Sequence, residues 1–181
     1  DTDFHLPESK AARLAACYRF TPTEPMQLVD DPQTSPYLRP PTFISGGGGL
    51  VSTLSDYLRF CRMLLNGGSL DGVRILGSKT IELMGANHLP GGKDLTQISV
   101  SLFSEATYAG VGFGLGFAVT LDPARTLMPG TVGDLSWGGM AGTYFWVDPR
   151  EELIVIFMTQ LMPSATYPTR RELRTLVYSA M

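Results

Sequence analysis

The spacing of apolar residues changes along this chain from a helical period to a strand period and then back again. Between Leu54 and Leu65 apolar residues recur every three or four positions, as on one face of a helix. From Val111 onward they alternate with glycine or polar residues, as in half-buried strands. The segment 169–181 returns to the helical period. Its apolar residues on one face are Leu173, Leu176, Val177 and Ala180. This order predicts an α+β fold, an antiparallel sheet flanked by helices.

Local signals set the ends of the elements. Thr53 and Asp56 form a capping-box-like start for the first long helix, and Gly67 with Gly68 ends it. The other elements expected are a short helix over 8–18, a hairpin over 70–76 around Asp71-Gly72, a helix over 78–84 capped by Ser78, and a strand hairpin formed by 142–148 and 152–160.

The segment 21–42 contains six of the 13 prolines. Each proline removes a backbone donor and fixes φ, so this segment is neither a long helix nor a central strand. We expect an extended loop lying against another part of the protein, as a functional rim or as a wrap around a part that this chain lacks.

Composition excludes several classes of protein. The chain has 181 residues, 44% of them apolar, which is enough for one globular domain or part of a larger one. The 14 basic and 17 acidic residues give a net charge of −3 without a basic stripe, so we expect no nucleic-acid partner. The longest apolar stretch, Leu153–Met158, is far shorter than the roughly 20 residues of a membrane-spanning helix.

Cysteine and histidine usage gives no metal site and no disulfide framework. Cys17 and Cys61 are the two cysteines, and the helical pattern around Cys61 predicts a small core residue. The two histidines, His5 and His88, have no ligand spacing around them. We therefore expect no bound metal.

The segment that remains for chemistry is Trp137-Gly138-Gly139-Met140. The chain has no Gly-x-Ser-x-Gly, Ser-x-x-Lys or Tyr-x-Asn motif that could supply a nucleophile. Two glycines at the start of a strand leave backbone N–H groups open to a ligand, so an edge strand of this kind can donate to an oxyanion. The alternative is a glycine-relieved bulge with Trp137 packed on the core.

Several ordered motifs resemble the C-terminal half of the serine β-lactamase-like hydrolases, in the branch of class C β-lactamases and family VIII carboxylesterases. The motifs are Gly-Gly-Gly-Gly-Leu-Val-Ser-Thr-Leu-Ser-Asp-Tyr-Leu-Arg-Phe (46–60), Leu-Leu-Asn-Gly-Gly (64–68), Gly-Val-Arg-Ile-Leu (72–76), Gly-Phe-Gly-Leu-Gly-Phe (112–117), Trp-Gly-Gly-Met-Ala-Gly-Thr (137–143) and Val-Asp-Pro (147–149). Each is weak alone, but together they are specific and span essentially the whole chain.

The resemblance implies a β-lactamase/transpeptidase-like fold of which 1–181 is the C-terminal portion. Within it, 1–110 is expected to hold helices and long loops, and 111–181 the antiparallel strands and the terminal helix. Family members carry Ser-x-x-Lys and Tyr-x-Asn upstream of the matching region, so this chain alone is expected to be inactive. The family's chemistry runs on side chains and backbone amides, so no cofactor is implied.

The motif departs from the family's β-lactamase form, which has Lys-Thr-Gly where this chain has Trp137, Gly138 and Gly139. Tryptophan brings no positive charge, so an anionic β-lactam loses a counter-ion there, whereas a neutral ester does not. The resemblance therefore implies a carboxylesterase-type enzyme and leaves open a weak β-lactamase activity.

Residue by residue, the resemblance makes the backbone N–H of Met140, after Gly139, a donor of the oxyanion hole. Trp137 would line the substrate pocket. Gly48 stands where class C β-lactamases have a tyrosine, which implies a more open pocket, unless the glycines only let the loop enter the helix. Tyr144 and the 162–167 loop either border the site or pack ordinarily.

Two functions remain open. In the first, the chain is the C-terminal half of a serine hydrolase that acts on a small ester or a β-lactam-like substrate through an acyl-enzyme. In the second, it is an inactive binding module. A half-domain leaves a sheet edge and an apolar face uncovered, which favours self-association or pairing with the missing N-terminal half.

Overall fold

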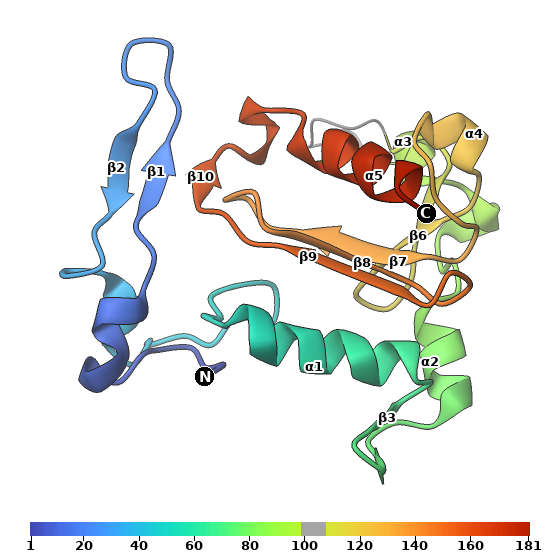
Figure 1. Ribbon diagram of the computed structural model, residues 1–181, viewed down its shortest axis with the longest axis horizontal. Coiled ribbons are helices and arrows are strands. Elements are labelled where there is room, and N and C mark those ends of the chain that lie inside the picture. The colour runs from blue at the N-terminus through green and yellow to red at the C-terminus, as the bar shows by residue number, and fades with distance from the viewer. Residues whose placement is uncertain (99–107) are drawn as a thin grey trace.

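The computed structural model, which describes residues 1–98 and 108–181, is built around a five-stranded antiparallel sheet with a helix on each face (Figure 1). In spatial order its strands are β5 (Val111–Phe113), β6 (Ala118–Thr120), β7 (Leu135–Gly138), β8 (Tyr144–Asp148) and β9 (Leu153–Phe157). Helix α1 (Leu54–Leu65) lies below the sheet in the view of Figure 1, and α5 (Thr169–Ser179) lies above it. The predicted α+β class, with an antiparallel sheet flanked by helices, is confirmed.

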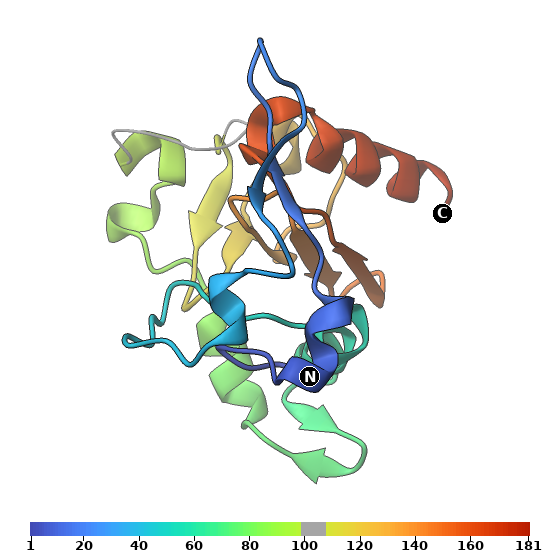
Figure 2. The same cartoon turned by 90° about the vertical axis from the view of Figure 1, so that its left-hand side faces the viewer.

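Two strands from the first part of the chain and one from near its end form a smaller sheet that stands beside the main one (Figures 1 and 2). Its order is β10 (Leu161–Met162), β1 (Cys17–Arg19) and β2 (Gln27–Asp30), and β1 runs parallel to β10. The helix predicted over 8–18 is wrong in its second half: a 3-10 helix, η1, covers only Glu8–Arg13, and Cys17–Arg19 is a strand. The distant segment 160–162 accepts backbone hydrogen bonds from Tyr18 and Phe20, and this pairing overrides the local helical spacing.

The remaining elements are short. They are η2 (Pro36–Leu38), the hairpin of β3 (Ser69–Leu70) and β4 (Val73–Arg74), α2 (Ser78–Met84), η3 (Pro90–Gly92), α3 (Leu95–Ile98), α4 (Pro123–Thr126) and η4 (Ser164–Thr166). The predicted hairpin and the hairpin of β8 and β9 are both present. The prediction that Ser78 caps α2 is wrong, because Ser78 is the first helical residue. The cap is Gly77, which has no side chain to accept a capping hydrogen bond.

Helix α1 begins and ends where its sequence predicts. The Thr53 hydroxyl accepts a hydrogen bond from the Asp56 amide at 3.1 Å. At the other end Gly68 has φ +96°, and a Cβ there would lie 2.2 Å from the Leu76 carbonyl oxygen, so only glycine fits. The inner face of α1 packs on the sheet in one apolar core. The buried core residues are Cys61, Met63, Leu64, Leu70, Phe117, Val119, Leu135, Phe145 and Val147.

Helix α5 meets the sheet with an unexpected face. The apolar face predicted for 169–181 is wrong in part, because Leu176 is 68% exposed and Ala180 is also exposed. The buried residues of the helix are Arg170 and Arg174, and Tyr178 follows at the same four-residue spacing. Charged side chains are buried only when they have partners. Those partners flank β7: Asp134 precedes the strand, and the Gly139 carbonyl follows it.

Candidate active site

The segment that carries the candidate site is the end of β7, which is the middle strand of the sheet and not an edge strand. Leu135 and Ser136 pair with β6 on one side, whereas Trp137 and Gly138 pair only with β8. The strand therefore runs past the end of β6, and its last residues have one side open. A strand end of this kind presents backbone groups as an edge strand does.

The turn that follows β7 is held by its own backbone and by β10. The Gly139 amide donates to the Thr143 carbonyl at 2.8 Å, and the Gly142 amide donates back to the Gly139 carbonyl at 3.1 Å. The Leu161 amide donates to Ala141 at 2.8 Å. Met140, at the tip, is 75% exposed, and its amide donates to no acceptor among the described residues. Among the described residues the Met140 amide at the tip of the turn is thus uncommitted, as are the amides of Ala141 and Thr143.

Trp137 lies beside this turn and outside the main apolar core of the described residues. Its ring is edge-on to that of Phe113, with centroids 4.9 Å apart, and tilted against that of Tyr108 at 6.4 Å. The side chain is 39% exposed. It forms an aromatic wall that solvent reaches on one side.

Tyr144 pairs in register with Gly138, so it adjoins the same strand end. Its hydroxyl accepts a hydrogen bond from Arg174 at 3.3 Å, and burial raises the pKa of the phenol although Arg174 acts against that shift. Tyr144, Gly138 and Trp137 border a cavity of about 40 Å³ between the sheet and α5, with room for about two or three waters. A cavity of this size has room for water but not for an ester.

Gly48 lies apart, in the exposed loop that precedes α1. Figure 1 places this loop and the turn after β7 toward the same end of the sheet. A Cβ added at Gly48 would meet no atom within 4 Å, so the position has room for a side chain. The 162–167 loop contains η4, and its Tyr167 is exposed with its ring 6.4 Å from that of Phe20.

Arg170 is a site residue that sequence reasoning missed. Its Nη2 donates to the Gly139 carbonyl at 2.8 Å, and its guanidinium lies 5.4 Å above the centre of the Tyr144 ring. A Cβ at Gly138 would lie 2.6 Å from the guanidinium carbon, so this glycine lets the arginine approach the strand. The available signal was the four-residue spacing of Arg170, Arg174 and Tyr178 on the terminal helix.

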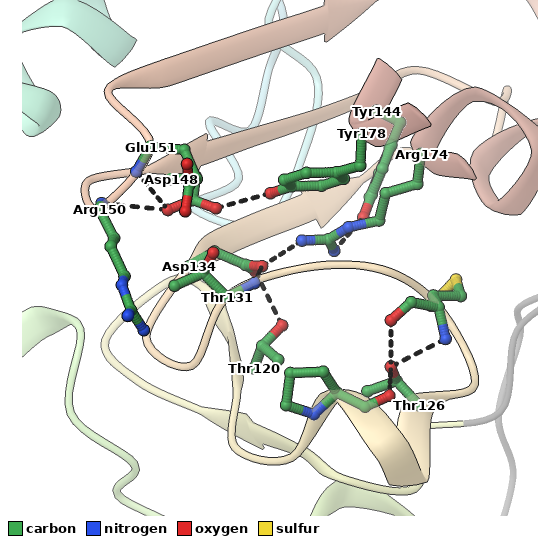
Figure 3. A network of polar contacts seen from close by, with 12 residues as sticks. Thr120, Thr126, Thr131, Asp134, Tyr144, Asp148, Arg150, Glu151, Arg174 and Tyr178 are labelled. Carbon is green, nitrogen blue, oxygen red and sulfur yellow. Dashed lines mark hydrogen bonds and ion pairs between the residues drawn. The ribbon is translucent and has the colours of Figure 1, made fainter. Parts of the chain in front are cut away.

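A buried polar network fastens α5 to the start of β7 and the end of β8 (Figure 3). Asp134 is ion-paired with Arg174, and it accepts hydrogen bonds from the Thr120 hydroxyl at 2.8 Å and the Thr131 amide at 3.2 Å. Arg174 also lies over the Trp146 ring, 5.3 Å from its centre. Burial nevertheless raises the pKa of Asp134, although Arg174 and the hydrogen bonds from Thr120 and Thr131 act against that shift. The buried Arg174 Nε has no hydrogen-bond partner among the described residues.

The second carboxylate of the network, Asp148, closes the turn between β8 and β9. It accepts hydrogen bonds from the Tyr178 hydroxyl at 2.7 Å and from the amides of Arg150 and Glu151 at 3.1 and 3.2 Å (Figure 3). Burial acts against ionisation of Asp148, but hydrogen bonds from Thr131, Tyr178 and the two amides outweigh it and hold its pKa below the ordinary value. Burial and the bond to Asp148 raise the pKa of Tyr178.

The other candidate groups lie away from this site. Cys61 is fully buried, as predicted, and burial raises the pKa of its thiol to about 12. Within residues 1–98 and 108–181, no group of three histidine, cysteine, aspartate or glutamate side chains could hold a metal ion. In the same residues no helix combines the length and the apolar character needed to cross a membrane.

The antiparallel sheet with a helix on each face is the α+β fold of the penicillin-binding-protein-like superfamily. The family model for Beta-lactamase matches residues 1–179, so the chain belongs to this family. Among the solved structures, EstCE1, described as a hydrolase with promiscuous acyltransferase activity, aligns with a TM-score of 0.76 and 26% identity over 98% of this chain and 46% of its own. The β-lactamase/transpeptidase-like fold is thus confirmed.

Two more distant structures show the same fold. Simvastatin synthase (LovD) from Aspergillus terreus aligns with a TM-score of 0.76 and 22% identity over 99% of this chain and 46% of its own. A penicillin-binding protein homologue from Caulobacter crescentus aligns with a TM-score of 0.64 and 18% identity over 100% of this chain and 48% of its own.

A curated relative, Protein Rv1367c of Mycobacterium tuberculosis, is 38% identical over 166 residues. The match covers 90% of this chain and 40% of the relative. The chain therefore spans about two fifths of the length of this curated relative.

Proposed function

We propose that this chain is the C-terminal half of a serine hydrolase that cleaves carboxylic esters through an acyl-enzyme. The observation that carries the proposal is the uncommitted amide of Met140 at the end of β7, beside Trp137. A backbone N–H at a turn held by its own hydrogen bonds is the kind of donor that stabilises a tetrahedral oxyanion. The serine, its lysine and the tyrosine come from the segment that precedes this chain in the longer protein.

The proposed preference for esters rests on the absence of a positive charge at position 137, where the residue is tryptophan. A lysine at this position would attract the carboxylate of a β-lactam, whereas the half-exposed indole supplies an apolar wall and one N–H. The likeness to EstCE1, a hydrolase with promiscuous acyltransferase activity that is 26% identical, supports a reaction that passes through an acyl-enzyme. Weak β-lactamase activity is compatible with the same site.

The test uses the complete longer protein that carries these residues. It is expected to hydrolyse a short-chain p-nitrophenyl ester, and a serine-directed fluorophosphonate is expected to label its upstream serine. The 181-residue chain alone is expected to give neither signal, because it holds no Ser-x-x-Lys motif. A longer protein without turnover, or labelling of the chain alone, would overturn the proposal.

A non-catalytic binding module is the second candidate, and one feature favours it. Several large apolar side chains before and within the first half of α1 are exposed to solvent. They are Phe43, Ile44, Leu50 and Leu54, which are 79%, 65%, 56% and 52% exposed. Such a surface favours association with the preceding half or with a second copy of the chain. A monomeric chain in gel filtration that also fails to bind the separate preceding half would count against this module.

A further inference from the structure

The peptide group between Gly139 and Met140 is held by a side chain of α5, Arg170, which contacts its carbonyl oxygen. Arg170 Nη2 donates to the Gly139 oxygen at 2.8 Å and lies 3.4 Å from the Thr143 oxygen. The Gly142 amide donates to the same Gly139 oxygen at 3.1 Å. One cationic and one neutral donor therefore share this carbonyl.

The Gly139 carbonyl and the Met140 N–H belong to one planar peptide unit. In a trans peptide these two groups point in opposite directions, so fixing the carbonyl fixes the direction of the N–H. A cation on the carbonyl oxygen also polarises the unit and makes the N–H a stronger donor. The contact of Arg170 thus acts on the amide at the exposed tip of the turn, although the arginine itself is 9% exposed.

Arg170 is itself held in place. It lies on α5, its guanidinium is stacked over the Tyr144 ring, and Arg174 one turn along the helix is ion-paired with Asp134 at the start of β7. The helix is thus fastened to β7 at both ends of the strand. The glycine at 138 leaves the space that the guanidinium occupies, since a Cβ there would lie 2.6 Å from it.

We propose that Arg170 is a positioning residue for the oxyanion hole, which orients and polarises the Met140 amide through the Gly139 carbonyl. This inference rests on the proposed function for its catalytic consequence, but the restraint on the amide can be measured without activity. Because the amide interacts with charge that develops in the transition state, Arg170 acts on kcat more than on KM.

The first experiment follows the Met140 amide by NMR relaxation in the ¹⁵N-methionine-labelled 181-residue chain. The order parameter of this amide is expected near the rigid value of about 0.85 and to fall toward about 0.6 in Arg170→Met. Arg171→Met, an exposed neighbour on the same helix, is the matched control and should leave it unchanged. An order parameter unaffected in Arg170→Met overturns the proposal, whatever the enzyme does.

The second experiment measures ester hydrolysis by the longer protein. Arg170→Met is expected to lower kcat by about 10- to 100-fold with KM within about twofold, as for a displaced oxyanion donor. Arg170→Lys, which keeps the charge but not the planar guanidinium, should fall in between. Added methylguanidinium should restore part of the rate to Arg170→Ala, which a fold defect would not allow.

The two experiments distinguish failure of the proposed esterase function from failure of the positioning role of Arg170. If the wild-type longer protein has no esterase activity, the proposed function fails while the order parameter still decides whether Arg170 restrains the amide. If the wild-type enzyme is active and the Arg170 variants keep their kcat, the positioning role is overturned.

Discussion

Arg174 and Asp134 form an ion pair that solvent scarcely reaches, with side chains 5% and 0% exposed. The pair joins the last helix to the start of the central strand, 40 residues earlier in the chain. A buried pair stabilises only when its hydrogen bonds are satisfied, and removing one partner leaves the other charge buried alone. Loss of one member of the pair is therefore expected to destabilise the contact between the last helix and the sheet.

Arg174→Met is expected to lower the free energy of unfolding by about 3–5 kcal/mol, because Asp134 would remain buried without its cation. The double variant Asp134→Leu with Arg174→Met should lose much less than the sum of the two single changes. Urea denaturation of the four proteins measures this coupling. Arg171→Met serves as the exposed control, and additive losses would contradict the expectation.

Tyr178→Phe removes a hydrogen bond to Asp148 and is expected to cost about 1–3 kcal/mol of stability near neutral pH. The pKa of Asp148 is lowered in the folded state, so the unfolded chain takes up the proton first as the pH falls. The corresponding stability is present above the ordinary carboxyl pKa of about 3.9 and is lost below it.

The free energy of unfolding should therefore fall less for Tyr178→Phe than for the wild type when the pH is lowered from about 6 to about 3. This range contains the ordinary carboxyl pKa. Urea denaturation at a series of pH values gives the comparison, with Tyr167→Phe at an exposed position as the control. Parallel pH curves for wild type and Tyr178→Phe would show that this bond does not set the Asp148 pKa.

The Cys61 thiol is expected to resist alkylation in the folded protein. It is fully buried and its pKa is raised to about 12, so little thiolate exists at pH values near 8 and reagents cannot reach it. In a Cys17→Ala background, iodoacetamide labelling followed by mass spectrometry should track global unfolding. Labelling of the native protein at the rate of an exposed thiol would count against the placement of Cys61 in the core.

Trp137→Lys in the longer protein is expected to shift specificity from neutral esters toward anionic β-lactams. A charge-assisted hydrogen bond to the β-lactam carboxylate is worth about 1.5–3 kcal/mol, or roughly ten- to a hundredfold in the ratio of kcat/KM values. Trp137→Phe keeps the apolar wall without charge and should leave this ratio nearly unchanged. An equal effect of both substitutions would mean that ring size, not charge, sets the preference.

Gly48→Tyr tests the open-pocket interpretation of the loop before α1. The position has no neighbour within 4 Å of an added Cβ, so the substitution should change stability by less than about 0.5 kcal/mol. If Gly48 borders the pocket, kcat/KM for a bulky acyl ester should fall relative to that for acetate, while Gly47→Tyr in the same loop should have no such effect. Unchanged selectivity would leave the glycines with only the role of letting the loop enter the helix.

The sequence predicted the elements whose signals are local. Helix α1 has its cap at Thr53, its apolar period and its terminal glycines within one short segment, so both ends were predictable. The strand β1 was not, because it exists through hydrogen bonds to residues about 140 positions later. The hairpin of β8 and β9 needed only alternation and a short turn.

The candidate site likewise contains residues that the sequence predicted and one that it did not. Trp137 to Met140 stood out through their own residue types and the family resemblance. Arg170 could not be placed, because an arginine on an amphipathic helix is usually solvated, and its burial depends on a carbonyl 31 residues away. The apolar pattern of α5 therefore indicated a face that is partly exposed, while the polar residues found partners on the sheet.

The close approach of Arg170 to Gly138 also bears on how this strand could change by mutation. A threonine at position 138, as in Lys-Thr-Gly, would put its Cβ where the guanidinium now lies, so the arginine would have to leave the Gly139 carbonyl. The two sites are thus epistatic: the benefit of one substitution depends on the state of the other. An evolutionary path from this strand to the lysine-bearing form would have to alter the terminal helix as well, and single-step variants along it would carry the cost of a displaced arginine.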